Sequence, residues 1–186
     1  MPSLLVVEDG TAKADANTFV TYAQLKTWLT ARGLTLDATE ATVEADMVRA
    51  ADYLRNEERF PWRGTRKTAT QTMPWPRTGA SERGGQAIGS TDIPWRVKEA
   101  QMALVLKARA ADLQPALDRG GKIASESVSG ATSVSYQADA SPETVYPDVT
   151  GILEPLLRCK GYLNAVPYQN DAEVGTPYEP GEYNNT

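Results

Sequence analysis

Apolar residues recur at intervals of three and four positions in three stretches of the chain, the spacing that keeps them on one face of an α-helix. The stretch after Thr39 is the most regular, because Val43, Met47, Ala50 and Leu54 follow this spacing without a break. We therefore predict three long helices and a shorter fourth one, at residues 21–32, 39–58, 94–111 and 148–160.

The ends of these helices carry signals of their own. Thr21 is followed three residues later by Gln24, which is the spacing of a capping box, and Gly33 comes directly after the last helical position. Pro94 suits the first helical position of the third helix. Pro155 lies inside the fourth predicted helix and is expected to kink or restart it.

Two segments do not follow a helical period. Residues 122–137 alternate apolar and polar side chains around the turn dipeptide Ser129-Gly130, which predicts a β-hairpin. Residues 60–93 have no period and contain three prolines and five glycines. A loop of this length inside a compact domain usually has a function. Residues 4–7 predict one further short strand.

These elements predict a mainly α fold, namely a small helical bundle with a β-hairpin extension. The folded domain is expected to cover residues 1–163. Residues 164–186 are rich in proline, glycine and asparagine and have no apolar period, so they predict an extended C-terminal arm that is not part of the core.

The composition argues against an enzyme. The 186 residues include no histidine and one cysteine, Cys159. Without histidine there is no Ser-His-Asp triad, no histidine zinc site and no imidazole general base. One cysteine leaves no internal disulfide and no Cys-x-x-Cys site, and no phosphate-binding glycine loop occurs. We therefore expect no catalytic residue, no metal and no cofactor.

The hydropathy profile gives no reason to expect a membrane partner. No apolar run approaches the roughly 20 residues that cross a bilayer. The first residues lack a basic region followed by an apolar stretch, so no secretory signal is expected. A soluble protein of a reducing compartment is the expectation.

The net charge of −5 is unevenly distributed along the chain. Residues 55–83 carry seven bases against three acids, and residues 84–125 carry six against four. The flanking regions are acidic, with four bases against eight acids in 1–54 and two against nine in 126–186. Acidic ends therefore enclose a basic middle, an asymmetry that the function has to explain.

Basic and aromatic residues alternate in segment 59–83, where the candidate site residues are Trp62, Arg63, Trp75, Pro76 and Arg77. Three interpretations stay open. The rings could stack on the bases of single-stranded DNA while arginine and lysine follow its phosphates. The tryptophans could instead anchor the long loop onto the helices. The segment could also form a subunit contact, because tryptophan and arginine are enriched at interface hot spots.

Several short motifs match one family when they are taken in order. They are Leu5-Val6-Val7-Glu8-Asp9-Gly10, Ala16-Asn17-Thr18-Phe19-Val20, Arg49-Ala50-Ala51-Asp52-Tyr53-Leu54, Trp62-Arg63-Gly64, Trp75-Pro76-Arg77-Thr78-Gly79, Ile93-Pro94 and Gly121-x-Ile123-x-Ser125-Glu126-x-Val128. Over about residues 5–157, the chain resembles the head-to-tail adaptor (head completion, or connector) proteins of tailed bacteriophages. These proteins are often labelled "putative DnaT-like single-stranded-DNA-binding proteins".

The resemblance implies a structural protein of the virion neck, assembled in the host cytoplasm, whose copies form a dodecameric ring. The ring would lie below the portal and continue the DNA channel to the tail. The implied partners are the portal protein, neighbouring copies, a downstream tail or stopper/nozzle protein, and double-stranded DNA passing through the lumen. The alternative is a single-stranded-DNA-binding module that uses residues 59–83.

The arm contains Tyr168, Tyr178 and Tyr183 together with four acids. A tyrosine offers a large ring and a hydroxyl group at low entropic cost, which suits a segment that becomes ordered on binding. Proteins of the resembling family use an extended C-terminal arm to hold the portal. The resemblance therefore implies that these three tyrosines dock on the portal protein.

Overall fold

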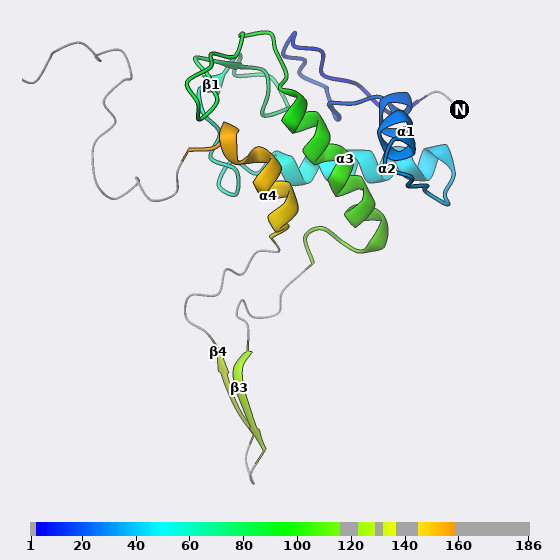
Figure 1. Cartoon of the computed structure of the whole chain (residues 1–186), viewed down its shortest axis with the longest axis vertical. Helices are drawn as coiled ribbons and strands as arrows, with labels where there is room; N and C mark the ends of the chain where they lie inside the picture. Colours follow the sequence, from blue (N-terminus) through cyan, green and yellow to red (C-terminus); the bar gives the residue numbers. More distant parts are fainter. Residues whose placement is uncertain (1–2, 116–122, 129–131, 137–144, 159–186) are drawn as a thin grey trace, which may run out of the picture.

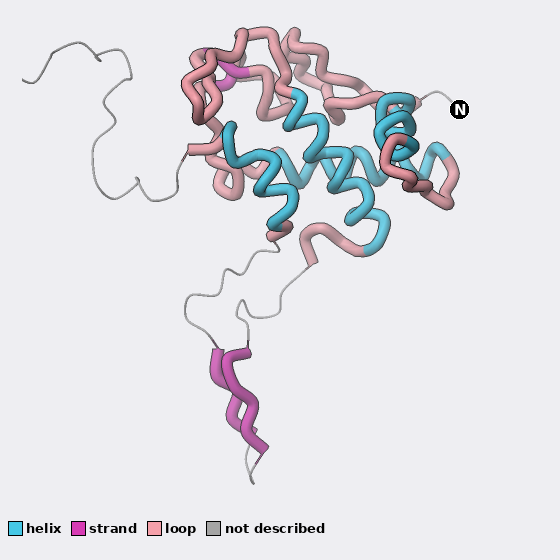
Figure 2. The backbone as a smooth tube through the Cα atoms, viewed as in Figure 1, coloured by secondary structure: helices cyan, strands magenta, loops and turns pink. Residues whose placement is uncertain are grey.

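The computed structural model describes residues 3–115, 123–128, 132–136 and 145–158. The helices in this part of the chain are α1 (Tyr22–Thr30), α2 (Glu40–Leu54), α3 (Trp95–Ala110) and α4 (Pro147–Leu153). Figure 1 and Figure 2 show α2 and α3 crossing at the centre of the body, with α4 beside α3 and α1 near one end of α2. The prediction of a mainly α fold is confirmed. None of the described helices is long and apolar enough to span a membrane.

The described residues also form two antiparallel pairs of strands. The short pair β1 (Thr65–Arg66) and β2 (Arg77–Thr78) lies in the long loop between α2 and α3. The longer pair is β3 (Ile123–Val128) and β4 (Thr132–Tyr136), so the predicted hairpin is present. Among the described residues, β3 and β4 pair only with each other, and Figure 1 shows no helix beside them.

The helix ends follow the capping signals more closely than the apolar period. Thr21 and Gln24 form the expected capping box at α1. Helix α2 ends at Leu54, four residues before the predicted end, and the chain then turns as the backbone N–H of Phe60 donates to the Asn56 carbonyl oxygen. Apolar spacing alone gave no reason to end the helix there.

The fourth helix also differs from its prediction. It ends at Leu153, and Glu154–Leu156 form a 3₁₀ turn that contains Pro155. The restart expected at this proline is therefore a single tight turn, because proline cannot donate the next helical hydrogen bond. Residues 159 and 160 lie outside the described part of the chain.

The core lies where α2, α3, α4 and the N-terminal segment meet. Gln101 of α3 is fully buried there and connects three segments. Its side-chain amide donates to the carbonyl oxygen of Met47 and the hydroxyl of Thr18, while its oxygen accepts the backbone N–H of Phe19. Because every polar atom of this side chain is paired, its burial does not cost an unsatisfied group.

The N-terminal segment is not the strand expected at residues 4–7. Only Val7 pairs, in an isolated bridge with Thr18. The segment is shaped instead by Glu8, which is 1% exposed and accepts backbone N–H groups of Gly10, Ala12 and Lys13. A carboxylate that gathers three backbone donors stabilises a tight loop, which prevents the extended pairing of a sheet.

Candidate functional site

Arg77 lies at the centre of the loop that joins α2 to α3. Its side chain is 5% exposed. Its Nε donates to the carbonyl oxygen of Arg63 at 2.9 Å, and its two terminal nitrogens donate to those of Pro74 at 3.0 Å and Gly64 at 2.9 Å. A guanidinium presents five donors in a rigid fork, so one side chain can hold several chain segments. Arg77 therefore fixes the shape of the loop around itself.

Gly64 lies where this loop comes closest to β2. Its φ of +70° is in the left-handed region, and a Cβ built there would lie 2.6 Å from the carbonyl oxygen of Thr78. Both the backbone conformation and the close approach require glycine. The motif Trp62-Arg63-Gly64 thus has a packing explanation within a single copy.

Trp62 and Trp75 lie in the core, with 2% and 0% of their surface exposed. Their rings meet edge to face with centroids 6.1 Å apart, and Trp62 also lies 5.6 Å from the ring of Phe60. Among the described residues, neither indole N–H has a hydrogen-bond acceptor, so their contribution is packing. Base stacking needs an accessible ring face, and the burial of both rings does not fit the stacking interpretation of these two residues.

Two candidates remain, Arg63 and Pro76, and Arg63 connects the loop to the residues that follow α4. The backbone N–H of Arg63 donates to the carbonyl oxygen of Leu156 at 3.0 Å, and its Nε donates to that of Leu157 at 3.2 Å. The carbonyl oxygen of Pro76 accepts the side-chain amide of Gln71 at 3.0 Å, and the Trp75–Pro76 peptide bond is cis. The structure therefore brings the candidate residues of this segment together inside one copy. Their hydrogen bonds hold the loop in shape and against the residues that follow α4.

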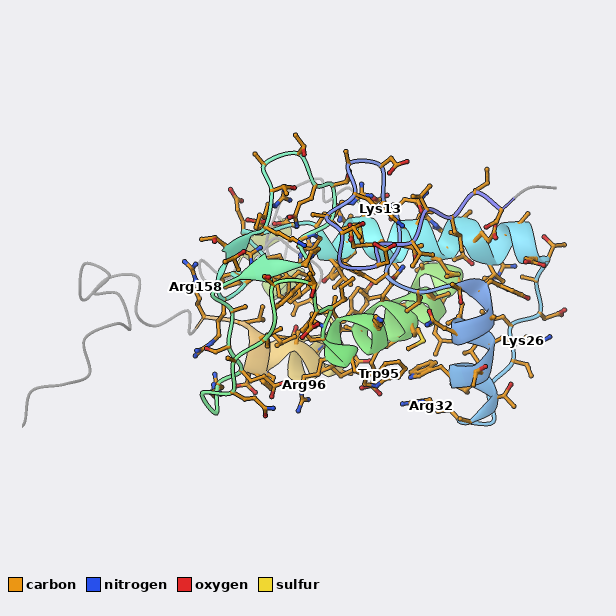
Figure 3. The ribbon with its side chains drawn as sticks, turned by 90° about the horizontal axis from the view of Figure 1, so that it is seen from above. Lys13, Lys26, Arg32, Trp95, Arg96 and Arg158 are labelled. Carbon is orange, nitrogen blue, oxygen red and sulfur yellow. The ribbon has the colours of Figure 1, made fainter. Side chains whose placement is uncertain are left out.

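Three cations form a basic cluster, which we define as Arg63 and Arg66 of this loop together with Arg158, which follows the 3₁₀ turn after α4. Arg158 lies at one end of the body (Figure 3). Burial lowers the pKa of Arg77 beneath the cluster; Glu57 acts in the opposite direction, and the positive charges of Arg158 and Arg66 lower it further. Arg66 pairs with Glu57 at 2.7 Å. Glu57 therefore offsets part of the positive charge around Arg77.

The structure also places a tryptophan that sequence analysis did not select. Trp95, the first residue of α3, is 57% exposed and points away from the core (Figure 3). It borders a hollow of about 490 Å³. We call this the Trp95 hollow, and its walls combine apolar residues and acids with one arginine: Ile88, Pro94, Trp95, Glu82, Asp92, Glu99 and Arg96.

A signal for Trp95 was present in the sequence. The buried positions of α3 include Val97, Gln101, Leu104 and Ala108, which repeat at helical spacing. Trp95 does not fall on this series, because a residue two positions before Val97 lies on another side of the helix. A large aromatic residue outside the buried series was therefore a candidate for surface exposure.

The described residues also form a second concave feature. A smaller groove of about 170 Å³ lies between α1 and the loop before α2, lined mainly by apolar side chains that include Leu29, Leu34 and Leu36. Within the described ranges, no group of three or more cysteine or acidic side chains is placed to hold a metal ion. The tyrosines at 168, 178 and 183 and the domain boundary expected at 163 lie outside the described residues.

Comparison with known proteins gives one match. A family model described as "Putative DnaT-like ssDNA binding protein" matches residues 3–168, which is most of the chain. No curated protein and no solved structure matches the chain significantly.

Proposed function

This chain belongs to the family described as "Putative DnaT-like ssDNA binding protein", and within that family we propose that it is a structural subunit, a head-to-tail adaptor of a tailed bacteriophage. Its copies form a dodecameric ring below the portal, in the virion neck, and continue the DNA channel toward the tail. Portal protein, neighbouring copies and a downstream tail or stopper/nozzle protein are its partners. The proposal involves no catalytic step and no cofactor.

The hairpin is the observation that carries this proposal. An isolated two-stranded hairpin is marginally stable in water and needs a packing surface. Among the described residues, β3 and β4 pair only with each other. Their register aligns Ser127 with Ser133 and Val128 with Thr132. A subunit that contributes a hairpin to a neighbouring copy obtains the missing surface on assembly.

The charge of the chain supports a channel wall better than a DNA-binding protein. Sequence-independent affinity for DNA comes from cations that neutralise phosphates, whereas this chain carries −5. A ring of acidic copies repels the phosphate backbone, so DNA passes through its lumen without being held. Imaging the neck of a purified particle tests this placement.

Single-stranded DNA binding is the second candidate function, and the description of the family favours it. Segment 59–83 could supply cations for this function through the basic cluster. Because Trp62 and Trp75 are buried, the contribution of base stacking would have to come from other rings. The two candidates therefore differ in how strong and how salt-dependent the binding should be.

We expect only weak binding to a single-stranded oligonucleotide of roughly 20 nucleotides, longer than the sites of about 4–16 nucleotides that such proteins cover. At physiological salt the Kd should exceed about 10 µM, within the range of non-specific electrostatic binding, and affinity should fall steeply as salt is raised. Fluorescence anisotropy measures it. A sub-micromolar Kd at that salt would favour the second candidate, and a double-stranded oligonucleotide of the same length serves as the control.

A further inference from the structure

We propose that the Trp95 hollow of one copy receives an arginine from the basic cluster of the next copy, so that these two surfaces form the contact between neighbours in the ring. The inference rests on the proposed function and identifies the acidic face that the basic loop meets. It depends on three observations: the exposure of Trp95, the charge of the hollow, and the positive charge of the basic cluster, in which Arg66 alone has an ion pair among the described residues.

The hollow has the chemistry of a guanidinium receptor. Its ring, Trp95, is 57% exposed, and its volume of about 490 Å³ lies within the range of roughly 300–1,000 Å³ of sites that enclose small ligands. Two of its acids form ion pairs with partly exposed arginines. Glu82 lies 3.8 Å from Arg96, and Glu99 lies 2.7 Å from Arg32.

The third carboxylate of the hollow is Asp92, and its side chain is exposed. It forms no ion pair with another described residue. Three acids therefore line a hollow that contains one arginine, Arg96. Such a surface attracts a cation and repels a phosphate. A protein segment that carries arginine is favoured over a nucleic acid as its occupant.

Cations placed over aromatic rings recur in this fold. The guanidinium carbon of Arg32 lies 3.9 Å from the ring centroid of Trp28, and that of Arg59 lies 4.1 Å from the ring of Tyr53. Such contacts are strongest at tryptophan. Among the described residues, no cation lies over Trp95. Tryptophan and arginine are enriched at interface hot spots. The exposed ring of Trp95 can therefore form a cation–π contact with an arginine of a neighbouring copy.

The basic cluster supplies such an arginine. Arg158 is exposed, and its terminal nitrogen donates to the backbone carbonyl oxygen of Gly64 at 3.2 Å. Burial lowers the pKa of Arg77 and Glu57 raises it, while the positive charges of Arg158 and Arg66 lower it further. An acidic surface placed against this cluster would relieve that repulsion between like charges.

The hollow and the cluster lie at separate places on the same copy. Figure 3 shows Arg158 at one end of the body, and Trp95 and Arg96 along a long side. A contact between two different but complementary surfaces is heterologous, and its repetition from copy to copy forms a ring when the rotation closes. A contact of this kind is what a ring with a continuous channel requires.

Charge reversal on both surfaces tests the contact with the full chain. One variant carries Glu82→Lys and Asp92→Lys in the hollow, and the other carries Arg66→Glu and Arg158→Glu in the cluster. Each variant alone presents like charges at every contact, so its self-association should be at least about tenfold weaker than that of the natural chain. An equimolar mixture of the two pairs opposite charges at every contact and should associate about as strongly as the natural chain.

Sedimentation velocity at concentrations up to about 1 mM measures this association, where even a Kd in the millimolar range becomes visible. Trp95→Ala should weaken it roughly three- to thirtyfold, the range that a cation–π contact gives. Lys26→Glu is the matched control, because Lys26 lies on α1, away from both surfaces (Figure 3). This control should associate as the natural chain does, and thermal unfolding of each variant verifies that it is folded.

Three results would overturn the inference: a natural chain that stays monomeric at about 1 mM, a mixture that associates no better than its components, or a Trp95→Ala chain that loses oligonucleotide binding but not self-association. The last result would assign the hollow to nucleic acid. Failure of the proposed function gives a different result from failure of this inference. In that case the chain would be absent from the particle neck, while the mixture of the two charge-reversed variants would still associate.

Discussion

Replacement of Arg77 by methionine, which keeps an unbranched apolar stem and removes the guanidinium, should lower the free energy of unfolding by about 3 kcal/mol. The substitution removes the side-chain donors to the carbonyl oxygens of Arg63 and Pro74, and it leaves the carbonyl oxygen of Gly64 with only the more exposed Arg158 as a donor. Each buried group that loses its partner costs about 1–3 kcal/mol, and part of this cost is recovered where water reaches the oxygen. Urea denaturation measures the loss.

Arg158→Met provides the matched control for this experiment. Arg158 belongs to the same charged region but is exposed, and exposed substitutions of this kind usually change stability by less than about 0.5 kcal/mol. Arg77→Lys should fall between the two, because an ammonium group cannot reproduce the fork. If Arg77→Met were as stable as the natural chain, the loop would not be held by this side chain, and its explanation in terms of packing would be wrong.

Removal of residues 164–186 should leave a folded subunit that no longer attaches to portal-bearing heads. Residues 164–186 have no apolar period, so the truncation should preserve the thermal unfolding midpoint. If the arm holds the portal through its tyrosines, heads stay incomplete and infectious yield falls to that of a strain without the protein. Complementation in infected cells, together with co-sedimentation on purified heads, measures the effect.

The tyrosines themselves can be tested separately from the length of the arm. A chain with Tyr168→Ala, Tyr178→Ala and Tyr183→Ala should behave as the truncated chain does, whereas the three tyrosine-to-phenylalanine replacements should retain most of the attachment, because the ring supplies most of the buried area. A truncated chain that completes heads at the normal rate would show that the arm has no docking role.

The helices could be predicted from the sequence because their signals are local. Thr21, Gln24 and the period from Val43 to Leu54 each depend on residues within one or two turns of helix. The hairpin was predictable for the same reason, since β3 and β4 adjoin in sequence and alternate their polar and apolar positions. The apolar period alone did not set the end of α2, where the turn closed between Asn56 and Phe60 decides it.

The long loop could not be predicted, because its order comes from contacts between distant residues. Arg77 reaches back to carbonyl oxygens 13 and 14 residues earlier, and Arg63 bonds to a residue 94 positions later. No periodic pattern reports such contacts. The composition of the candidate site was visible in the sequence, but its exposure was not: a basic and aromatic segment looks the same whether Trp62 and Trp75 face solvent or the core.

Trp95 is the opposite case to Trp62 and Trp75, because the sequence did not single it out and the structure exposes it. In the sequence, Pro94-Trp95-Arg96 indicates only the start of a helix. Exposure in the folded chain makes it a candidate contact, because tryptophan is enriched among the residues that dominate protein interfaces. The identity of a residue therefore became informative only after the fold separated the buried tryptophans from the exposed one.

The most direct test of the adaptor proposal is an electron-microscopic reconstruction of the phage neck with this chain present. We expect a ring of copies of the helical body directly below the portal, with each β3–β4 hairpin against the neighbouring copy and the Trp95 hollow facing the next copy's basic cluster. Purified, infectious particles that lack this chain in the neck, or a neck whose density below the portal cannot accommodate its four-helix body, would contradict the proposal.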